Sequence, residues 1–210
     1  MLKLYNYFRS TASYRVRIAL NYKELPYQLH EIHLVNGGGE QFSAEYQTIN
    51  PQSLVPSLVD DNIVIHQSIA IIEYLEERYP KPALLPNDPV VRAHIRSLAQ
   101  IIACDIHPLN NLRVLKYLKN DIKVTDKQKQ QWYHYWIIQG FTAIEKILQQ
   151  QGSSGKFCFG NKVTLADIVL IPQVYNANRF NCSLDNFPLI KQINDHCLTL
   201  SYFANAAPGE

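Results

Sequence analysis

The first half of the sequence has no cysteine. The four cysteines all lie in the second half: Cys104, Cys158, Cys182 and Cys197. No two of them have Cys-x-x-Cys spacing, so neither a thioredoxin-type redox pair nor a cysteine-based zinc site is expected. We expect buried free thiols that pack as small apolar side chains. No metal site is predicted at His30 and His33 either, because residues three apart on a strand face opposite sides.

The sequence also lacks an apolar run near the roughly 20 residues that a membrane-spanning helix needs. The segment Met1–Tyr7 turns polar too early for the apolar stretch of a secretory signal. We therefore expect a cytoplasmic protein that has no membrane partner.

Neither sign of charge is in large excess. Lys and Arg together number 20 and Asp and Glu number 18, which gives a formal net charge of +2. This balance argues against bulk electrostatic binding of nucleic acid, although it permits a local basic pocket for a small anion. Hydrophobic residues make up 47% and charged residues 18% of the chain, which is typical of a folded protein with a sizeable core.

Prolines mark the clearest boundary in the chain, at Pro80, Pro82, Pro86 and Pro89. Proline removes a backbone donor and blocks helix continuation, so this stretch is predicted to be an extended linker. We predict a first domain over residues 1–80, a linker over 81–89 and a second domain over 90–210.

Strands and helices alternate in the first domain. The alternation of apolar residues and the turn signals predict strands at 2–8, 27–34, 57–59 and 63–65, with helices at 13–21 and 69–78. Asp60-Asp61-Asn62 between the last two strands is a hairpin signal. In the first helix, Val16, Ala19 and Leu20 share one face and are expected in the core. This order favours a mixed sheet with helices on its faces.

Helical periodicity dominates the second domain. The predicted helices cover residues 90–103, 109–119, 127–149 and 165–176. Thr164-Leu165-Ala166-Asp167 resembles a capping box in which Asp replaces the usual Glu. We interpret Asp167 as a residue that stabilises the fold and takes no part in catalysis.

Hydroxyl side chains precede the first helix at Ser10, Thr11 and Ser13, where they can cap its free N–H groups. A helix N-terminus also stabilises a nearby anion. Three arginines crowd the same place: Arg9, Arg15 and Arg17. Helix capping with solvated arginines is one interpretation, and a site for an anionic ligand is the other.

A second potential anion site lies at His66-Gln67-Ser68, between the predicted hairpin and the next helix. Ser68 stands at a helix start, with its hydroxyl and backbone N–H available. The predicted fold allows the two helix starts to open at the same edge of the sheet. A cis Pro56, after Val55, would present the backbone of that valine to a ligand in a tight turn.

The segment Phe8–Leu20 resembles the signature of the zeta-class glutathione transferases, the maleylacetoacetate isomerases. That signature reads Ser-Ser-Cys, two variable residues and Arg-Val-Arg-Ile-Ala-Leu. The resemblance covers nearly the whole chain and continues through Asn50-Pro51, Val55-Pro56, His66-Gln67-Ser68, Leu84-Leu85-Pro86, Thr164-Leu165-Ala166-Asp167 and Pro172-Gln173-Val174.

The resemblance implies an α/β, thioredoxin-like N-terminal domain, an all-α C-terminal helical domain and a homodimer. It implies glutathione as the cofactor and a small maleyl diketo acid as the substrate. The implied reaction converts maleylacetoacetate to fumarylacetoacetate in tyrosine and phenylalanine catabolism. Glutathione would supply the thiolate for reversible addition to the cis double bond, so the protein needs no cysteine of its own near the site.

The resemblance also assigns roles to individual residues. Ser10 donates a hydrogen bond to the glutathione sulfur with Thr11 in support, and Arg179 binds a substrate carboxylate; these three form the catalytic set. The implied glutathione-binding residues are Ser10, Gln41, Val55, Pro56, Gln67, Ser68, His107, Asn111 and Arg113. The implied substrate-binding residues are Arg9, Arg15 and Arg179, whereas Arg17 is expected to have a structural role.

The sequence departs from the family pattern at several of these positions. Ala12 stands where the family has cysteine, and Thr11 replaces the second serine. Tyr14 stands where Trp or His is usual. His107 replaces a common Gln, and Arg113 replaces a common Ser. The nucleophile belongs to glutathione, so the loss of the cysteine leaves the reaction possible and bears on how the substrate fits.

Three alternatives remain open from the sequence. The substrate could be maleylpyruvate, because pocket shape decides between the two maleyl acids. A general glutathione transferase or peroxidase would use the same Ser10 but would turn over neutral electrophiles better than dianions. A non-enzymatic binding module is the third alternative, because related folds also recognise partners.

Overall fold

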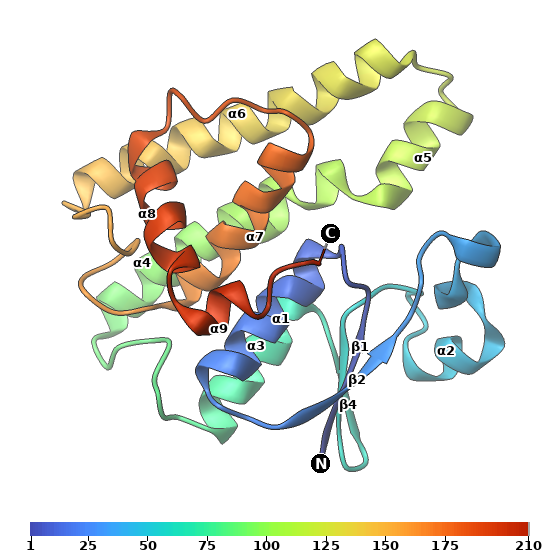
Figure 1. Ribbon diagram of the computed structural model, residues 1–210, viewed down its shortest axis with the longest axis horizontal. Helices are drawn as coiled ribbons and strands as arrows, with labels where there is room; N and C mark the ends of the chain where they lie inside the picture. Colours follow the sequence, from blue (N-terminus) through green and yellow to red (C-terminus); the bar gives the residue numbers. More distant parts are fainter. Residues whose placement is uncertain (210) are drawn as a thin grey trace. The chain divides into compact units, whose positions relative to one another are not determined.

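The computed structural model describes residues 1–209, and the chain divides into two compact units (Figure 1). Met1–Ala83 and the segment that begins at Leu200 form the first unit, and Leu84–Thr199 form the second. The boundary between Ala83 and Leu84 falls inside the linker predicted at 81–89. The sequence predicts one domain over residues 90–210, whereas in the structure the segment that begins at Leu200 belongs to the first unit.

The first unit contains the predicted mixed sheet, with strand order β2-β1-β3-β4. Strand β1 pairs parallel with β2 and antiparallel with β3, and β3 and β4 form the predicted hairpin. The strands that were predicted at 2–8 and 27–34 are shorter in the structure, because the chain turns away from the sheet after each. The strands are β1 Leu2–Asn6, β2 Tyr27–Glu31, β3 Ser57–Asp60 and β4 Ile63–His66.

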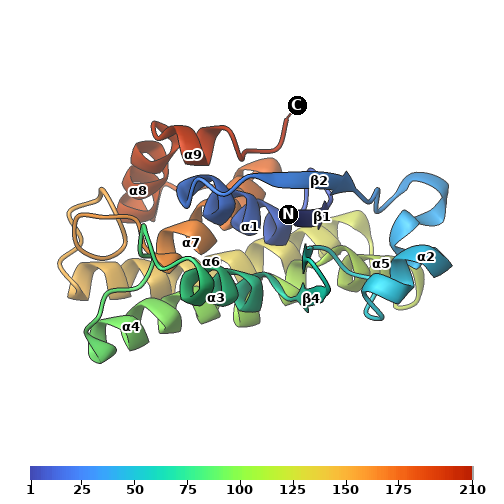
Figure 2. The same ribbon diagram turned by 90° about the horizontal axis from the view of Figure 1, so that it is seen from below.

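Helices cover both faces of this sheet. Helix α1 (Thr11–Tyr22) and helix α3 (Ser68–Arg78) lie on one side, and the short helix α2 (Ala44–Ile49) lies on the other in both views (Figures 1 and 2). The sequence analysis did not predict α2 or the two 3₁₀ turns before it. These turns are Asn36–Gly38 and Glu40–Phe42.

Apolar side chains fill the space between the sheet and helices α1 and α3. Strand β1 alternates, so Leu2 and Leu4 are buried while Lys3 is exposed. The predicted core positions of α1 are confirmed, because each is 0% exposed: Val16, Ala19 and Leu20. On the opposite face, a smaller cluster forms around Tyr7, Tyr46 and Val55, with Tyr5 and Ile49 packed against it.

Hydrogen bonds tie the C-terminal segment, which includes helix α9 (Ser201–Ala204), to helix α1. Arg17 Nε donates to the Ala206 carbonyl at 2.9 Å, and Tyr14 Oη donates to the Phe203 carbonyl at 3.3 Å. Arg17 also donates to the Phe8 carbonyl, 3.1 Å away. Arg17 is only 7% exposed, which agrees with the structural role expected for it and excludes a solvated arginine at this position. Arg17 therefore connects the segment before α1 with the C-terminal segment.

A buried lysine joins the ends of the two large helices of the first unit. Lys23 Nζ donates to Glu76 Oε2 at 2.7 Å, to the Tyr79 carbonyl at 2.7 Å and to the Pro82 carbonyl at 3.0 Å. The lysine side chain is 0% exposed. An ammonium group has three N–H donors, so these contacts satisfy it completely.

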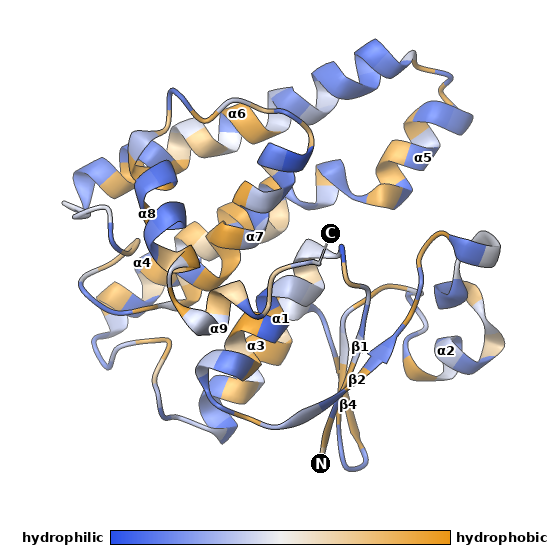
Figure 3. Cartoon of the chain, viewed as in Figure 1, coloured by the Kyte–Doolittle hydropathy of each residue, from blue (hydrophilic) through white to orange (hydrophobic). Residues whose placement is uncertain are grey.

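The second unit is helical, as predicted. Helix α7 is buried along most of its length and largely hydrophobic (Figure 3), and it packs against α4 and α8. Helix α8 was not predicted from the sequence, and the helix predicted at 109–119 begins instead with a 3₁₀ turn at Pro108–Asn110. The helices are α4 Pro89–Gln100, α5 Leu112–Asn120, α6 Asp126–Gln150, α7 Leu165–Arg179 and α8 Pro188–Leu198.

The predicted capping box is confirmed at the start of α7. Asp167 is 0% exposed, and its carboxylate accepts from the Thr164 N–H and hydroxyl, both at 2.8 Å. It also accepts from the Cys158 N–H at 2.7 Å. Burial raises the pKa of Asp167, while these hydrogen bonds lower it. The carboxylate therefore organises the chain before α7, as interpreted.

All four cysteines are free thiols. Cys158, Cys182 and Cys197 are buried as expected, but the expectation is wrong for Cys104, which is exposed. Within residues 1–209, no group of three or more His, Cys, Asp or Glu side chains is arranged to hold a metal ion. None of the helices in this part of the chain has the length and apolar character required to cross a membrane.

Replacing Lys23 with methionine is expected to lower the free energy of unfolding by about 3–5 kcal/mol, because a buried carboxylate then loses its cation. Urea unfolding measures the change. Lys129→Met is the matched control, because Lys129 forms an exposed ion pair with Asp126 at 3.4 Å. The control is expected to leave the unfolding midpoint unchanged. Equal losses in both variants would contradict a structural role for the buried pair.

Candidate functional site

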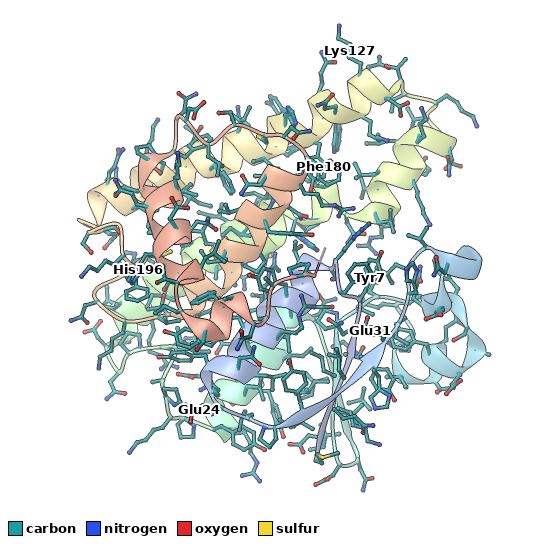
Figure 4. The ribbon with its side chains drawn as sticks, in the orientation of Figure 1. Tyr7, Glu24, Glu31, Lys127, Phe180 and His196 are labelled. Carbon is teal, nitrogen blue, oxygen red and sulfur yellow. The ribbon has the colours of Figure 1, made fainter. Side chains whose placement is uncertain are left out.

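The strand register brings four loop segments to one end of the sheet. Tyr5 pairs with Ser57, Ser57 pairs with His66, and Asn6 pairs with Glu31. The segments that follow β1, β2 and β4 therefore start at the same end, together with the segment that leads into β3. Figure 4 labels Tyr7 and Glu31 at this end of the strands.

These four segments carry all but one of the site residues predicted in the first domain, the exception being Arg15. Arg9, Ser10 and Thr11 follow β1, and Gln41 lies in the chain after β2. Val55 and Pro56 lead into β3, and Gln67 and Ser68 follow β4. The predicted meeting of the two helix starts at one edge of the sheet is thereby confirmed. Arg15 lies one turn further along α1.

Ser10 is the N-cap of helix α1. Its Oγ accepts a hydrogen bond from the Ser13 N–H at 3.2 Å, and its own N–H donates to the Tyr7 carbonyl at 2.9 Å. The cap uses Ser10 Oγ as an acceptor, so the hydroxyl hydrogen can be donated to another group. Thr11 begins the helix and is only 2% exposed, so its side chain lies within the protein.

The start of helix α3 forms the second part of the site. Gln67 has φ 69° and ψ 119°, a conformation that costs about 1–3 kcal/mol and is concentrated at ligand sites. Its Nε2 donates to Gln52 Oε1 at 2.8 Å. Ser68 is 5% exposed, and its hydroxyl accepts from Arg15 Nη1 at 3.2 Å.

The arginines near Ser10 have different surroundings. Arg15 is 1% exposed and contacts Ser68, so the solvated interpretation is wrong for it. Arg15 therefore supports Ser68 in the structure, and its contact with substrate stays a prediction. Arg9 is exposed, with its guanidinium 5.0 Å from the centre of the Phe8 ring. The exposure of Arg9 agrees with the interpretation of this arginine as a solvated surface residue.

The segments that contain Val55 and Gln41 complete this end of the sheet. The Val55–Pro56 peptide is cis, and Val55 is 8% exposed. Gln41 is buried, and its Oε1 has no hydrogen-bond partner among residues 1–209. Gly39, near it in the chain, has φ 111°, a backbone conformation that other residues rarely adopt, so glycine is favoured there. A surface hollow of about 540 Å³ opens along the glycine-rich loop that contains Gly39.

The second unit holds the other predicted site residues. His107 follows a π-helical turn at Ile101–Ile106. Asn111 caps α5 by accepting from the Arg113 N–H at 3.1 Å, and the Arg113 side chain is exposed. The next helix anchors this region, because the Asn110 side chain donates to the Tyr133 carbonyl at 3.1 Å.

Arg179 ends helix α7 and is exposed. Its guanidinium lies 5.3 Å from the centre of the Phe180 ring, which Figure 4 labels at this end of α7. The Phe180 ring stacks on Tyr133 with 3.8 Å between centroids. Burial raises the pKa of Tyr133, while the positive charge of Arg179 lowers it. Arg179 therefore presents a fixed cation beside an aromatic pair.

Several residues that support these groups could not be identified from the sequence. Gln52, Ser57 and Gly140 have no role assigned there. Asn50 was noted only as part of the family resemblance. Their signals are weak in a single sequence, because a serine in a strand or a glycine in a helix carries no pattern that marks it. The contacts of Gln52 with Gln67 and of Gly140 with Ile106 join residues distant in the chain.

Two protein families match the chain. Residues 4–83 match the glutathione S-transferase N-terminal domain, and residues 109–200 match the glutathione S-transferase C-terminal domain. The chain belongs to the glutathione S-transferase family. The predicted fold class is thereby confirmed, with a thioredoxin-like α/β domain and an all-α helical domain.

Individual relatives place this transferase in the zeta class. It is 47% identical to maleylacetoacetate isomerase of Mus musculus, over 98% of this chain and 91% of the relative. A zeta-class maleyl pyruvate isomerase, solved in a holo structure, is 45% identical over 98% of this chain and 96% of its own, with a TM-score of 0.94. A maleylacetoacetate isomerase of Anaeromyxobacter dehalogenans, solved with bound GSH, is 38% identical over 99% and 95%, with a TM-score of 0.87.

In the second unit of this transferase, a glycine fixes how closely α6 approaches the turn before His107. A Cβ at Gly140 would overlap Ile106 Cδ1 and Cγ1. Gly140→Ala is therefore expected to lower the free energy of unfolding by about 1–3 kcal/mol, although alanine favours helix.

The Ile106→Ala background provides the control, because it removes both atoms that the new Cβ would meet. Gly140→Ala is expected to be neutral or stabilising there. Urea unfolding of the two single variants and the double variant measures the coupling. An equal loss in both backgrounds would show that close packing at the π-helical turn is not the constraint.

Proposed function

We propose that this chain is a glutathione-dependent cis–trans isomerase that converts maleylacetoacetate to fumarylacetoacetate, a step of tyrosine and phenylalanine catabolism. The observation that carries the proposal is the Ser10 hydroxyl. It caps α1 through its oxygen, so its hydrogen can be donated to a sulfur at the helix N-terminus. The names of relatives that match nearly the whole chain support the choice of reaction.

The donor set at the sheet end suits glutathione. The tripeptide has a peptide backbone, two carboxylates and a thiol. Val55 offers backbone groups, and the start of α3 offers N–H groups and the Ser68 hydroxyl for the γ-glutamyl end. Gln41 has a buried Oε1 without a partner in the described part of the chain, which suits a polar group near the glycyl end. The GSH-bound relative supports this assignment.

Glutathione, when bound, supplies a thiolate whose reversible addition allows rotation about the former double bond. The protein's contribution is to favour ionisation. A free thiol has a pKa of ~8.5, so little thiolate exists at neutral pH. The Ser10 hydroxyl and the N-terminus of α1 stabilise negative charge on the sulfur. Each unit by which they lower the thiol pKa corresponds to about 1.4 kcal/mol.

The substrate contributes further negative charge, which grows when a nucleophile adds to the conjugated system. Arg179 is the exposed cation assigned to a substrate carboxylate, where fixed charge stabilises the developing anion. Arg15 is assigned to hold Ser68, and Thr11 to support Ser10 from within the helix. His107, Asn111 and Arg113 are proposed as glutathione contacts from the helical unit.

Maleylpyruvate is the second candidate substrate. The observation that favours it is the similarity to the zeta-class maleyl pyruvate isomerase, with a TM-score of 0.94 and 45% identity. A comparison of kcat/KM for the two maleyl acids decides between them.

We also propose a cytoplasmic homodimer, on the basis of the family resemblance, and sedimentation of the purified chain tests the dimer.

Ser10→Ala is expected to reduce glutathione-dependent isomerisation about 10- to 100-fold in kcat/KM, because a hydrogen bond to a charged group contributes about 1.5–3 kcal/mol. Ultraviolet absorbance of the maleyl substrate follows the reaction. Thr125→Ala is the matched control, because Thr125 caps α6 and accepts from the Gln128 N–H at the same 3.2 Å. Full activity in Ser10→Ala, or equal losses in both variants, would refute the assignment.

Arg179→Ala is expected to lower kcat/KM for a dianionic maleyl acid more than for a neutral electrophile, because only the former needs the cation. Arg78→Ala is the matched control, since Arg78 lies over the Tyr79 ring at 5.6 Å in a similar pairing. The control is expected to change neither value. Better turnover of neutral electrophiles by the unmodified chain would favour a general transferase.

A further inference from the structure

A buried hydroxyl network lies beneath the segments assigned to glutathione. Ser57 follows Pro56 at the start of β3 and is 0% exposed. Its Oγ lies 3.1 Å from Tyr46 Oη, 3.3 Å from Asn50 Nδ2 and 3.3 Å from His66 Nδ1. One hydroxyl therefore joins helix α2, the chain after α2 and the last residue of β4.

The same side chains hold the backbone before Val55. Tyr46 Oη donates to the Leu54 carbonyl at 2.7 Å, and Asn50 Nδ2 donates to that carbonyl at 2.8 Å. Both lone pairs of the Leu54 oxygen are thereby occupied. The network fixes the residue directly before the valine whose backbone is assigned to the tripeptide.

Asn50 also connects to the start of α3. Its Oδ1 accepts from the Gln52 N–H at 3.0 Å, and Gln52 Oε1 accepts from Gln67 Nε2 at 2.8 Å. His66 reaches the same place through the backbone, because it directly precedes Gln67. Two routes therefore run from this network to the proposed γ-glutamyl site.

The number of hydrogens available in the network determines which group donates and which accepts in each hydrogen bond. The Tyr46 hydroxyl gives its hydrogen to the Leu54 carbonyl, so its oxygen accepts the single hydrogen of Ser57. Asn50 donates to Ser57, and Ser57 has no second hydrogen to offer His66. His66 must therefore carry a hydrogen on Nδ1 and donate it to Ser57. Burial lowers the pKa of His66, which favours the neutral ring.

We propose that Tyr46, Asn50, Ser57 and His66 form a positioning network that sets Val55 and the Gln67–Ser68 helix start at the spacing glutathione requires. This inference rests on the proposed function, because it assumes that both segments bind the tripeptide. The network is not assigned contact with the sulfur or the substrate. It therefore acts on the affinity for glutathione and leaves the chemical step unchanged.

A matched pair of tyrosine variants tests the proposal. Tyr46→Phe removes the hydroxyl that contacts Ser57 and Leu54. Tyr74→Phe removes a hydroxyl of the same unit that donates to Asp60 Oδ2 at 2.7 Å, outside the network. Tyr46→Phe is expected to raise the Kd and KM for glutathione about 3- to 10-fold with kcat at saturating glutathione unchanged. Tyr74→Phe is expected to leave all three values unchanged.

Calorimetric titration with glutathione and steady-state kinetics separate the possible failures. If the unmodified chain does not bind glutathione, the proposed function fails. If it binds and Tyr46→Phe matches Tyr74→Phe, the positioning network fails and the proposed function stands. A fall in kcat with an unchanged KM would also overturn the network. Ser57→Ala, which removes a single heavy atom, carries the same test if Tyr46→Phe does not fold.

The histidine supplies a readout independent of activity. Nitrogen NMR of the labelled imidazole distinguishes the two neutral tautomers. The network requires the Nδ1–H form of His66 in the unmodified chain, and Ser57→Ala is expected to shift the balance toward Nε2–H because the acceptor is lost. A predominant Nε2–H form in the unmodified chain would overturn the assigned direction of the hydrogen bonds.

Discussion

The site depends on the pairing of three strands in one register. Tyr5, Ser57 and His66 stand side by side across β1, β3 and β4, so the segments next to them gather at one end of the sheet. A shift of one residue would turn the buried face of each strand to the other side. The buried side chains of β1 and β3, with Leu4 and Leu58 both 0% exposed, make such a shift costly.

The N-termini of helices α1 and α3, which lie at this end of the sheet, supply the groups proposed to bind glutathione. Ser10 caps α1 with its hydroxyl oxygen, so its hydroxyl hydrogen can be donated to another group. Ser68 is the first residue of α3, and its hydroxyl accepts a hydrogen bond from the buried Arg15. Neither helix has an acidic residue in its first turn. The positive ends of both helix dipoles are therefore available to an anionic ligand, which agrees with the proposed thiolate and γ-glutamyl carboxylate.

The sequence predicted the parts of this arrangement that depend on local pattern. The alternation in β1, the periodicity of α1, the hairpin at Asp61 and the capping box at Asp167 all follow from neighbouring residues. The hydrogen-bond partners of Arg15 and Arg17 could not be predicted, because Ser68 and Ala206 lie far away in the chain. Helix α2 was missed because its six residues are too short to show a helical period.

The central claim is that the first unit lowers the pKa of a bound thiol through Ser10 and the start of α1. Titration of glutathione bound to the unmodified chain, followed by the ultraviolet absorbance of the thiolate, tests it most directly. We predict a midpoint at least one unit below the ~8.5 of a free thiol. A midpoint equal to that of free glutathione, with binding intact, would contradict it.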